Sequence, residues 1–399
     1  MMIVFNIVLI LLAFFLVRRR MRVYDTPLNH LSIFTVVWVF IIVTAQIVYR
    51  EKLQEAAVLL YYLCLFAYLL GSSILKMPQV EHTLEKYYNQ RTVKVIILVL
   101  FVFCIIANYN LLEKVAFNFT SIETWIGMRT KDEFKEIDES NIFKALFQRA
   151  YLIFLPLALY LVRKKKFSKI LFGVLVLTAA VISLLKFTRA PFMQLVVVML
   201  ITYVYIYRVK LPVKTLGIGV ILVIVIFGIS QTLLLGDRAD AADISDQFWL
   251  YLSGGLITYQ DILNGNYHDS AGYDSPFYSL DWLNYVLKKL ELIDTYPDYV
   301  REWSKSLVSN TYTFLDAFTL DLGIPGAIAG SFSIGLFSDY SYQRIRKNNY
   351  NLFNIIFYGY VCYYNLFVFA NNEFIRFPVL LTVVMLLFLN FFTKKLRYE

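Results

Sequence analysis

Long apolar runs repeat along this 399-residue chain and constrain its fold more than any other feature. We find eleven runs, at about residues 2–17, 31–48, 56–75, 95–112, 148–162, 170–187, 190–207, 213–235, 311–337, 351–370 and 377–393. A helix of about 20 apolar residues crosses the hydrocarbon core of a bilayer, and these runs lack the alternation of a transmembrane β-strand. The sequence therefore predicts an all-α integral membrane protein, a polytopic bundle of about 11 transmembrane helices in a single transmembrane domain, residues 1–399.

The composition supports a membrane protein and argues against several classes of partner. Hydrophobic residues make up 59% of the chain and the mean hydropathy is +0.60, which excludes an ordinary soluble protein. Loops that face anionic lipid explain the net charge of +9, so we predict no nucleic-acid partner. Cys64, Cys104 and Cys362 lie far apart inside apolar runs, as buried free thiols do. We expect no metal and no cofactor.

Basic residues collect in every second gap between the apolar runs. The main clusters are Arg18, Arg19, Arg20 and Arg22; Arg163, Lys164, Lys165, Lys166 and Lys169; Arg208, Lys210 and Lys214; Arg344, Arg346 and Lys347; and Lys394, Lys395 and Arg397. A bias of Lys and Arg marks the cytoplasmic side, so we predict an outer N-terminus and a cytoplasmic C-terminus. The first run is followed by its arginines, not preceded by them, so we interpret it as a retained helix.

Two long gaps fall on the predicted outer face. Residues 113–147 mix charged and aromatic side chains, which predicts surface helices, with a solvated loop carrying interfacial anchors as the alternative. Residues 236–310 form a large tyrosine-rich loop that we interpret as an active-site cover, because a structureless loop of this length is uncommon. Within it we expect an amphipathic helix beginning near Pro276. We also expect a surface or re-entrant segment over 248–262, interrupted at Gly254-Gly255.

Four arginines lie at or near membrane level on this outer face, although the face is net acidic. Arg189 lies in the turn Lys186-Phe-Thr-Arg-Ala-Pro, Arg238 and Arg301 lie near the two ends of the large loop, and Arg376 lies between the last two runs. A guanidinium suits bidentate recognition of phosphate. The alternatives are snorkelling of Arg189 at a helix end and simple ion pairs with neighbouring acids.

Residues 310–330 form the most specific segment, because Asp316 and Asp321 interrupt the outer half of an apolar run. Acidic side chains inside a membrane are candidates for function, although Asp316 at the interface and Asp321 paired with a neighbour would be structural. Gly323, Pro325, Gly326 and Gly330 predict a kink and a close helix contact. His268, in the large loop, is a candidate general base or a solvated side chain.

Three local patterns resemble one family. They are Phe187-Thr-Arg-Ala-Pro-Phe; Asp237-Arg238 upstream of Trp249-Leu-Tyr-Leu-Ser-Gly-Gly; and Asn310-Thr-Tyr-Thr-Phe followed by Asp321-Leu-Gly-Ile-Pro-Gly. Together with the architecture they resemble the oligosaccharide repeat unit polymerases, also called O-antigen or capsule polymerases. The resemblance implies a metal-independent glycosyltransferase bundle of the C type in the bacterial cytoplasmic membrane. Its partners would be undecaprenyl-pyrophosphate-linked glycan, membrane lipid, a flippase and a chain-length regulator.

Roles follow from this resemblance as predictions. The growing glycan would move from its lipid pyrophosphate to a hydroxyl of the next lipid-linked unit, with Arg189 and Arg238 on the pyrophosphate and Arg301 and Arg376 behind them. The base would be Asp237, Asp316 or His268. The remaining predicted substrate-binding residues are Lys186, Tyr251, Asn310, Tyr312 and Asp321. Two alternatives stay open, an O-antigen ligase and a flippase of lipid-linked oligosaccharide. Related ligases have a glycine at the position where this chain has Ser279, which disfavours a ligase. The polar groups gather in one outer loop and its flanks, which favours an enzyme over a flippase.

Overall fold

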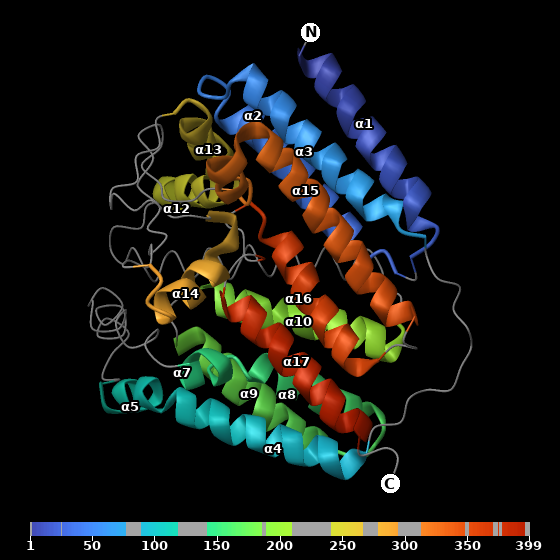
Figure 1. The fold of residues 1–399 in the computed structure, drawn as a ribbon, viewed down its shortest axis with the longest axis vertical. Coiled ribbons are helices and arrows are strands. Elements are labelled where there is room, and N and C mark those ends of the chain that lie inside the picture. Colours follow the sequence, from blue (N-terminus) through green and yellow to red (C-terminus); the bar gives the residue numbers. More distant parts are fainter. Residues whose placement is uncertain are drawn as a thin grey trace. The chain divides into compact units, whose positions relative to one another are not determined.

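The computed structural model contains helices as its only regular elements in the residues that it describes (Figure 1). These residues are 2–24, 26–76, 89–118, 142–185, 189–209, 241–265, 278–293, 313–347, 351–369, 374 and 377–395. Helices coincide with every predicted apolar run except 213–235, which lies outside the described residues. The all-helical part of the predicted fold is therefore confirmed.

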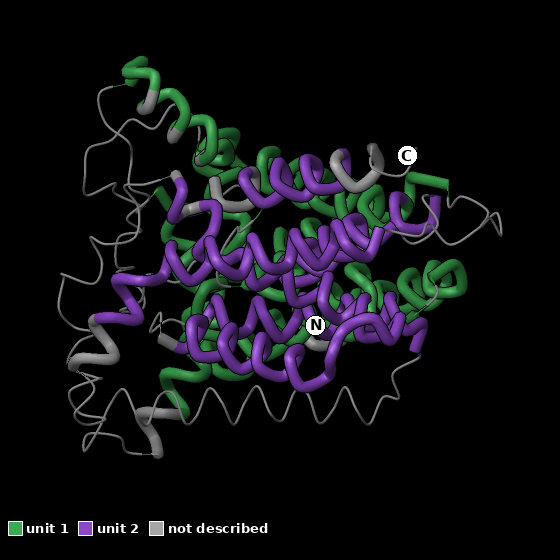
Figure 2. The backbone as a smooth tube through the Cα atoms, turned by 90° about the horizontal axis from the view of Figure 1, so that it is seen from below, with its two compact units in different colours: residues 1–78, 211–343, 364–379 green, residues 79–210, 344–363, 380–399 purple. Residues whose placement is uncertain are grey.

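The chain forms two compact units, each built from separate stretches of sequence (Figure 2). Unit 1 comprises residues 1–78, 211–343 and 364–379, and unit 2 comprises residues 79–210, 344–363 and 380–399. Three C-terminal helices pass from one unit to the other along the chain, namely α15 (Asp316–Lys347), α16 (Leu352–Leu366) and α17 (Phe377–Lys395). The single transmembrane domain that the sequence predicts over residues 1–399 stays a prediction.

Unit 1 is a bundle of α1 (Met2–Met21), α2 (His30–Val48), α3 (Glu55–Ile74) and the larger part of α15. Helices α3 and α15 pack backbone to backbone through glycine. A Cβ atom on Gly71 would lie 2.2 Å from the Phe332 carbonyl oxygen, and one on Gly335 would lie 2.2 Å from that of Tyr68. Small residues allow this close approach, which lets the Ser72 hydroxyl donate to the Gly335 carbonyl at 3.2 Å.

The large loop contributes α12 (Ala241–Trp249), the π-helix η3 (Leu250–Gly254) and α13 (Gly255–Leu263) to unit 1. Our expectation of a break at Gly254-Gly255 is wrong, because both glycines have right-handed helical angles and the helix continues through a π-turn. The segment packs on the end of the bundle where α2 ends and α3 begins. There the Gln54 N–H donates to Gln260 Oε1 at 2.6 Å, and Gln260 Nε2 donates to the Lys52 carbonyl at 3.1 Å.

Unit 2 contains the helices between residues 90 and 207, the greater part of α16 and nearly all of α17. These helices are α4 (Gln90–Ala107), α5 (Tyr109–Asn118), α7 (Ile142–Phe147), α8 (Tyr151–Arg163), α9 (Lys169–Leu185) and α10 (Arg189–Tyr207). Helix α8 is the core of the unit, because α4, α9 and α10 pack around it and most of its side chains are buried. Helices α5 and α7 lie within the predicted segment 113–147 or overlap it, and residues 119–141 lie outside the described residues.

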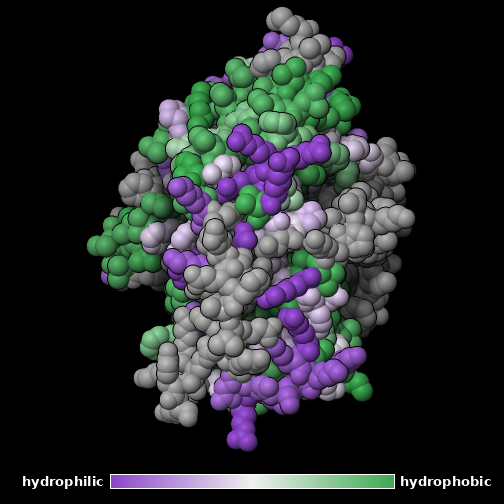
Figure 3. All heavy atoms as spheres, turned by 90° about the vertical axis from the view of Figure 1, so that its right-hand side faces the viewer, coloured by the Kyte–Doolittle hydropathy of each residue, from purple (hydrophilic) through white to green (hydrophobic). Residues whose placement is uncertain are grey.

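Several helices present large apolar side chains to the outside. Leu11 and Phe15 of α1 are each 63% exposed, Ile170 of α9 is 82% exposed, and α4 and α17 show the same pattern. In water such surfaces would aggregate, whereas lipid covers them. Among the described residues, five helices are long and apolar enough to span a bilayer: α2, α3, α4, α10 and α15. Figure 3 shows a face on which hydrophilic side chains gather beside a hydrophobic flank.

Helix α15 has the predicted kink. Gly323 leaves the helix with φ 66° and ψ −156°, and Pro325 follows it. A Cβ atom on Gly326 would lie 2.1 Å from the Phe318 carbonyl oxygen, and one on Gly330 would lie 2.4 Å from the Phe318 ring. The predicted close contact is therefore made within α15, where Asp316–Leu322 packs against the turns that follow the kink.

Candidate functional site

Asp316 is the first residue of α15 and is 1% exposed. The chain enters this helix along α16, since the Phe314 N–H donates to the Val368 carbonyl at 2.9 Å. Asp316 Oδ1 then accepts a hydrogen bond from the Ala317 N–H at 2.7 Å. Asp316, a predicted catalytic residue, is therefore buried in unit 1.

Two hydroxyl groups lie near Asp316. The Tyr259 hydroxyl of α13 and the Thr319 hydroxyl of α15 form a hydrogen bond, and Thr319 also donates to the Leu315 carbonyl at 2.9 Å. Burial raises the pKa of Tyr259, and the charge of Asp316 adds to the rise, so the phenol stays protonated as a donor. The Tyr61 hydroxyl of α3 donates to the Leu256 carbonyl, which fixes α13 against the bundle. A carboxylate and two hydroxyls thus meet below the large loop.

Asp321 has a structural role in the same segment. Its Oδ1 and Oδ2 each accept a hydrogen bond at 2.7 Å, from the N–H groups of Tyr278 and Ser279 respectively. These residues open the 3₁₀-helix η4 (Tyr278–Leu280), which leads into α14 (Asp281–Lys289), close to the start that we predicted near Pro276. The carboxylate caps this helix as an N-cap side chain would. Asp321 therefore ties the amphipathic helix of the large loop to α15, and its role in substrate binding stays a prediction.

The other predicted site residues are placed only in part. Tyr251 lies in η3 with its side chain 40% exposed, and Arg189 is the first residue of α10 in unit 2. The remaining ones lie outside the described residues: Lys186, Arg238, His268, Arg301, Asn310, Tyr312 and Arg376, together with the alternative base Asp237. Asp316 and Asp321 thus lie on one short helical segment, with Tyr259 close to Asp316.

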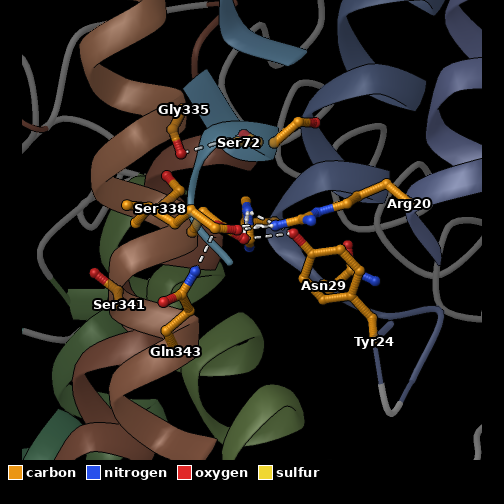
Figure 4. Close-up of polar contacts among 12 residues, drawn as sticks. Arg20, Tyr24, Asn29, Ser72, Gly335, Ser338, Ser341 and Gln343 are labelled. Carbon is orange, nitrogen blue, oxygen red and sulfur yellow. Dashed lines mark hydrogen bonds and ion pairs between the residues drawn. The ribbon is translucent and has the colours of Figure 1, made fainter. Parts of the chain in front are cut away.

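A second polar cluster lies at the opposite end of the unit 1 bundle, where α1 and α3 end, and the sequence reasoning missed it (Figure 4). Asp339 of α15 is fully buried and accepts hydrogen bonds from Arg20 Nη2 at 3.3 Å, the Tyr24 hydroxyl at 2.7 Å and Gln343 Nε2 at 3.0 Å. His30 Nε2 lies 4.0 Å from Asp339 Oδ1 and 3.5 Å from the Tyr24 hydroxyl. Burial raises the pKa of Tyr24 and the charge of Asp339 adds to this, so the phenol remains a donor.

The cluster continues into the bundle through neutral groups. The Tyr68 hydroxyl donates to Asn365 Oδ1 at 2.7 Å, and Asn365 Nδ2 donates to the Ser338 hydroxyl at 2.9 Å. Phe34 stacks on the Tyr68 ring with centroids 3.6 Å apart. Polar and aromatic groups of α2, α3, α15 and α16 thus interlock next to the buried ion pair.

His30 is the first residue of α2 and is fully buried. The N-cap residue Asn29 accepts a hydrogen bond from the Ser32 N–H at 3.1 Å and starts the helix one residue before the apolar run. The sequence did hold one signal, since Asp339 is an acidic residue beside an apolar run and cationic gaps flank that end of the bundle.

Comparison with known proteins adds no assignment: no family model, no curated protein and no solved structure matches this chain.

Proposed function

We propose that this protein polymerises undecaprenyl-pyrophosphate-linked oligosaccharide repeat units on the outer face of the bacterial cytoplasmic membrane. The observation that carries the proposal is the buried carboxylate of Asp316 beside the Tyr259 and Thr319 hydroxyls, at the end of unit 1 that the large loop covers. A carboxylate held in such a place suits a general base.

The reaction requires one proton acceptor and one anion stabiliser. A hydroxyl of the acceptor sugar attacks the anomeric carbon of the donor, its proton passes to the base, and the carbon–oxygen bond to the diphosphate breaks with its electron pair on the leaving oxygen. Asp316 serves as the base in this proposal. The arginines that the sequence predicts for stabilising the departing diphosphate are Arg189 and Arg238, with Arg301 and Arg376 as further candidates.

Helices of the large loop are fixed to the bundle, as a cover over an active site requires. Helix α13 is held on α3 by the Tyr61 hydroxyl and by Gln260, and α14 is tied to α15 by Asp321. Sugar rings stack on aromatic side chains, and Tyr251 is an exposed aromatic residue of the same segment. A cover fixed to the bundle excludes water from the anomeric carbon of the donor and so favours glycosyl transfer over hydrolysis.

The distribution of charge agrees with a reaction on the outer face of the membrane. Arg20 and Asp339 lie at the end of unit 1 where α1 ends, and the exposed Arg18, Arg19 and Arg22 are neighbours of Arg20 in the sequence. The Asp316 end is the opposite one along α15. If the basic end is cytoplasmic, as the Lys and Arg bias predicts, Asp316 faces outward, where lipid-linked repeat units are joined.

Reconstitution with defined lipid-linked repeat units tests the proposal. We expect a ladder of oligomers from the wild-type protein, and a rate reduced about 100-fold or more in Asp316→Asn. Asp246→Asn, which changes an exposed acid of α12 in the same loop, should leave the ladder unchanged. A single transfer to another acceptor would identify a ligase, and translocation without new bonds would identify a flippase; either outcome overturns the proposal.

A further inference from the structure

Unit 2 holds a separate polar cluster at the end where α8 and α10 begin. Arg149 lies in the turn before α8 and is half-buried, and its Nη1 donates to Gln194 Oε1 at 3.3 Å. Gln194 is 3% exposed and lies five residues after Arg189 on α10.

Side chains of two further helices complete the cluster. Tyr151 of α8 and Tyr360 of α16, which are 0% and 3% exposed, lie close enough to Arg149 to interact with its charge, and Thr382 of α17 bonds to Tyr360. The Tyr363 hydroxyl donates to the Ala190 carbonyl at 3.4 Å and so ties α16 to the first turn of α10. Four helices of unit 2 therefore meet around one cation.

The Tyr151 hydroxyl is the informative member of this cluster. It is buried and, in the part of the chain that the structure describes, it has no hydrogen-bond partner. Leaving a buried donor unsatisfied costs free energy, and native proteins keep few such groups. A ligand that brings an acceptor oxygen to this place would satisfy it.

The local field favours an anion as that ligand. Helices α8 and α10 both begin at this end of unit 2, and a helix N-terminus carries partial positive charge. The Arg149 guanidinium adds a full charge with a planar fork of donors, which matches two oxygens of a phosphate group.

We propose that Arg149, Tyr151 and Gln194 form a binding site for a phosphate group of a membrane lipid, which in this protein is the polyprenyl diphosphate of a glycan substrate. This assignment rests on the proposed function, and it adds Arg149 to the arginines predicted from the sequence. An anionic phospholipid headgroup shares the same chemistry and is the competing source.

Calorimetric titration of the purified full chain with farnesyl diphosphate, a short polyprenyl diphosphate without sugar, tests the site. We expect Arg149→Ala to weaken binding about tenfold or more, because charge-assisted hydrogen bonds are lost. Tyr151→Phe should weaken binding several-fold while leaving thermal stability equal or higher, since its hydroxyl makes no bond in the described residues. Arg91→Ala removes an exposed arginine at the other end of unit 2 and should change neither quantity.

The outcomes separate the sources and the two proposals. Unchanged affinity in Tyr151→Phe and Arg149→Ala, both folded, would overturn the site, as would displacement of the diphosphate by equimolar phosphatidylglycerol. Arg149-dependent binding in a protein that forms no glycan ladder would keep the site and overturn the polymerase. A normal glycan ladder and a normal affinity for farnesyl diphosphate in Arg149→Ala would overturn the site and keep the polymerase.

Discussion

Arg20 and Asp339 are 319 residues apart in the sequence, yet Arg20 Nη2 lies 3.3 Å from Asp339 Oδ2. The same Nη2 donates to the Leu75 carbonyl at 2.8 Å, at the end of α3. One guanidinium therefore joins the ends of α1, α3 and α15. The Asp339 side chain is fully buried and that of Arg20 is 18% exposed, so most of this ion pair is shielded from solvent.

Removing one partner of this pair should destabilise the protein strongly. In Asp339→Ala the Arg20 guanidinium would stay buried without its counter-charge, and such losses cost about 3 kcal/mol or more. We expect a lower midpoint of thermal unfolding for the purified protein. The control is Arg19→Ala, which removes an exposed arginine from the preceding position of α1 and should leave the midpoint unchanged.

The double variant Arg20→Ala/Asp339→Ala separates the interaction energy of the two side chains from the free-energy cost of burying each charge. If the pair acts as a unit, the double variant loses less stability than the two single variants would lose additively. Strict additivity would mean that the two side chains do not interact in the folded protein.

Glycine at the contact between α3 and α15 gives a second prediction. Gly335→Ala places a methyl group 2.2 Å from the Tyr68 carbonyl oxygen, so the helices must separate, and we expect a loss of about 1–3 kcal/mol from this overpacking. Gly173→Ala is the matched control, because no atom lies within 4 Å of the added Cβ in α9. There the better helix propensity of alanine should stabilise the protein by about 0.5–1 kcal/mol. Equal melting temperatures for the two variants would contradict the contact.

The long apolar runs predicted the helices well, because a segment in lipid must satisfy its backbone hydrogen bonds internally, as a helix does. The kink at Gly323 was also predictable, since glycine and proline are the common causes of such breaks. The two-unit division was not, because it depends on which distant helices pack together. The expected break at Gly254-Gly255 was wrong for a similar reason. Contacts with α2 and α3 keep that segment helical, although glycine has a low helix propensity.

The site was less predictable than the fold. Asp316 and Asp321 stood out as acids in an apolar run, but only the structure assigns Asp321 to the backbone of Tyr278 and Ser279. Arg20 is one of four arginines in its cluster and nothing in the sequence distinguishes it from Arg19. Its partner Asp339 is distant in sequence, so the pair emerges only from the packing of α1 on α15.

Sidedness is testable with engineered cysteines. Cys64, Cys104 and Cys362 are buried, so they should give little background with a membrane-impermeant maleimide. Asn264→Cys, at the exposed end of α13, should react in intact cells, whereas Lys166→Cys, in the exposed turn after α8, should react only after permeabilisation. The reverse pattern would place the Asp316 end in the cytoplasm and remove the basis for an outer-face reaction.

The tether between Asp321 and α14 predicts a local change in dynamics. Asp321→Ala removes the acceptors of the Tyr278 and Ser279 N–H groups, and each lost bond to a charged group is worth about 1.5–3 kcal/mol before discounting for its partial exposure. We expect faster amide hydrogen exchange in 278–289, with exchange in α2 and α3 unchanged. Asp321→Asn, which keeps one acceptor oxygen, should show an intermediate rate. If both variants exchange like the wild type, Asp321 is available for another role.

The backbone at Gly323 links stability to the candidate site. Its φ of 66° with ψ of −156° is a conformation that essentially only glycine adopts, so Gly323→Ala should cost about 1–3 kcal/mol although the nearest atom to the added Cβ is 3.9 Å away. Straightening the kink would also move Asp316–Leu322, which carries both acids. We therefore expect Gly323→Ala to lower the unfolding midpoint and to slow glycan polymerisation more than an equally destabilised variant, such as Gly335→Ala, does at the same temperature. Matching rates for these two variants would show that the kink supports only the fold.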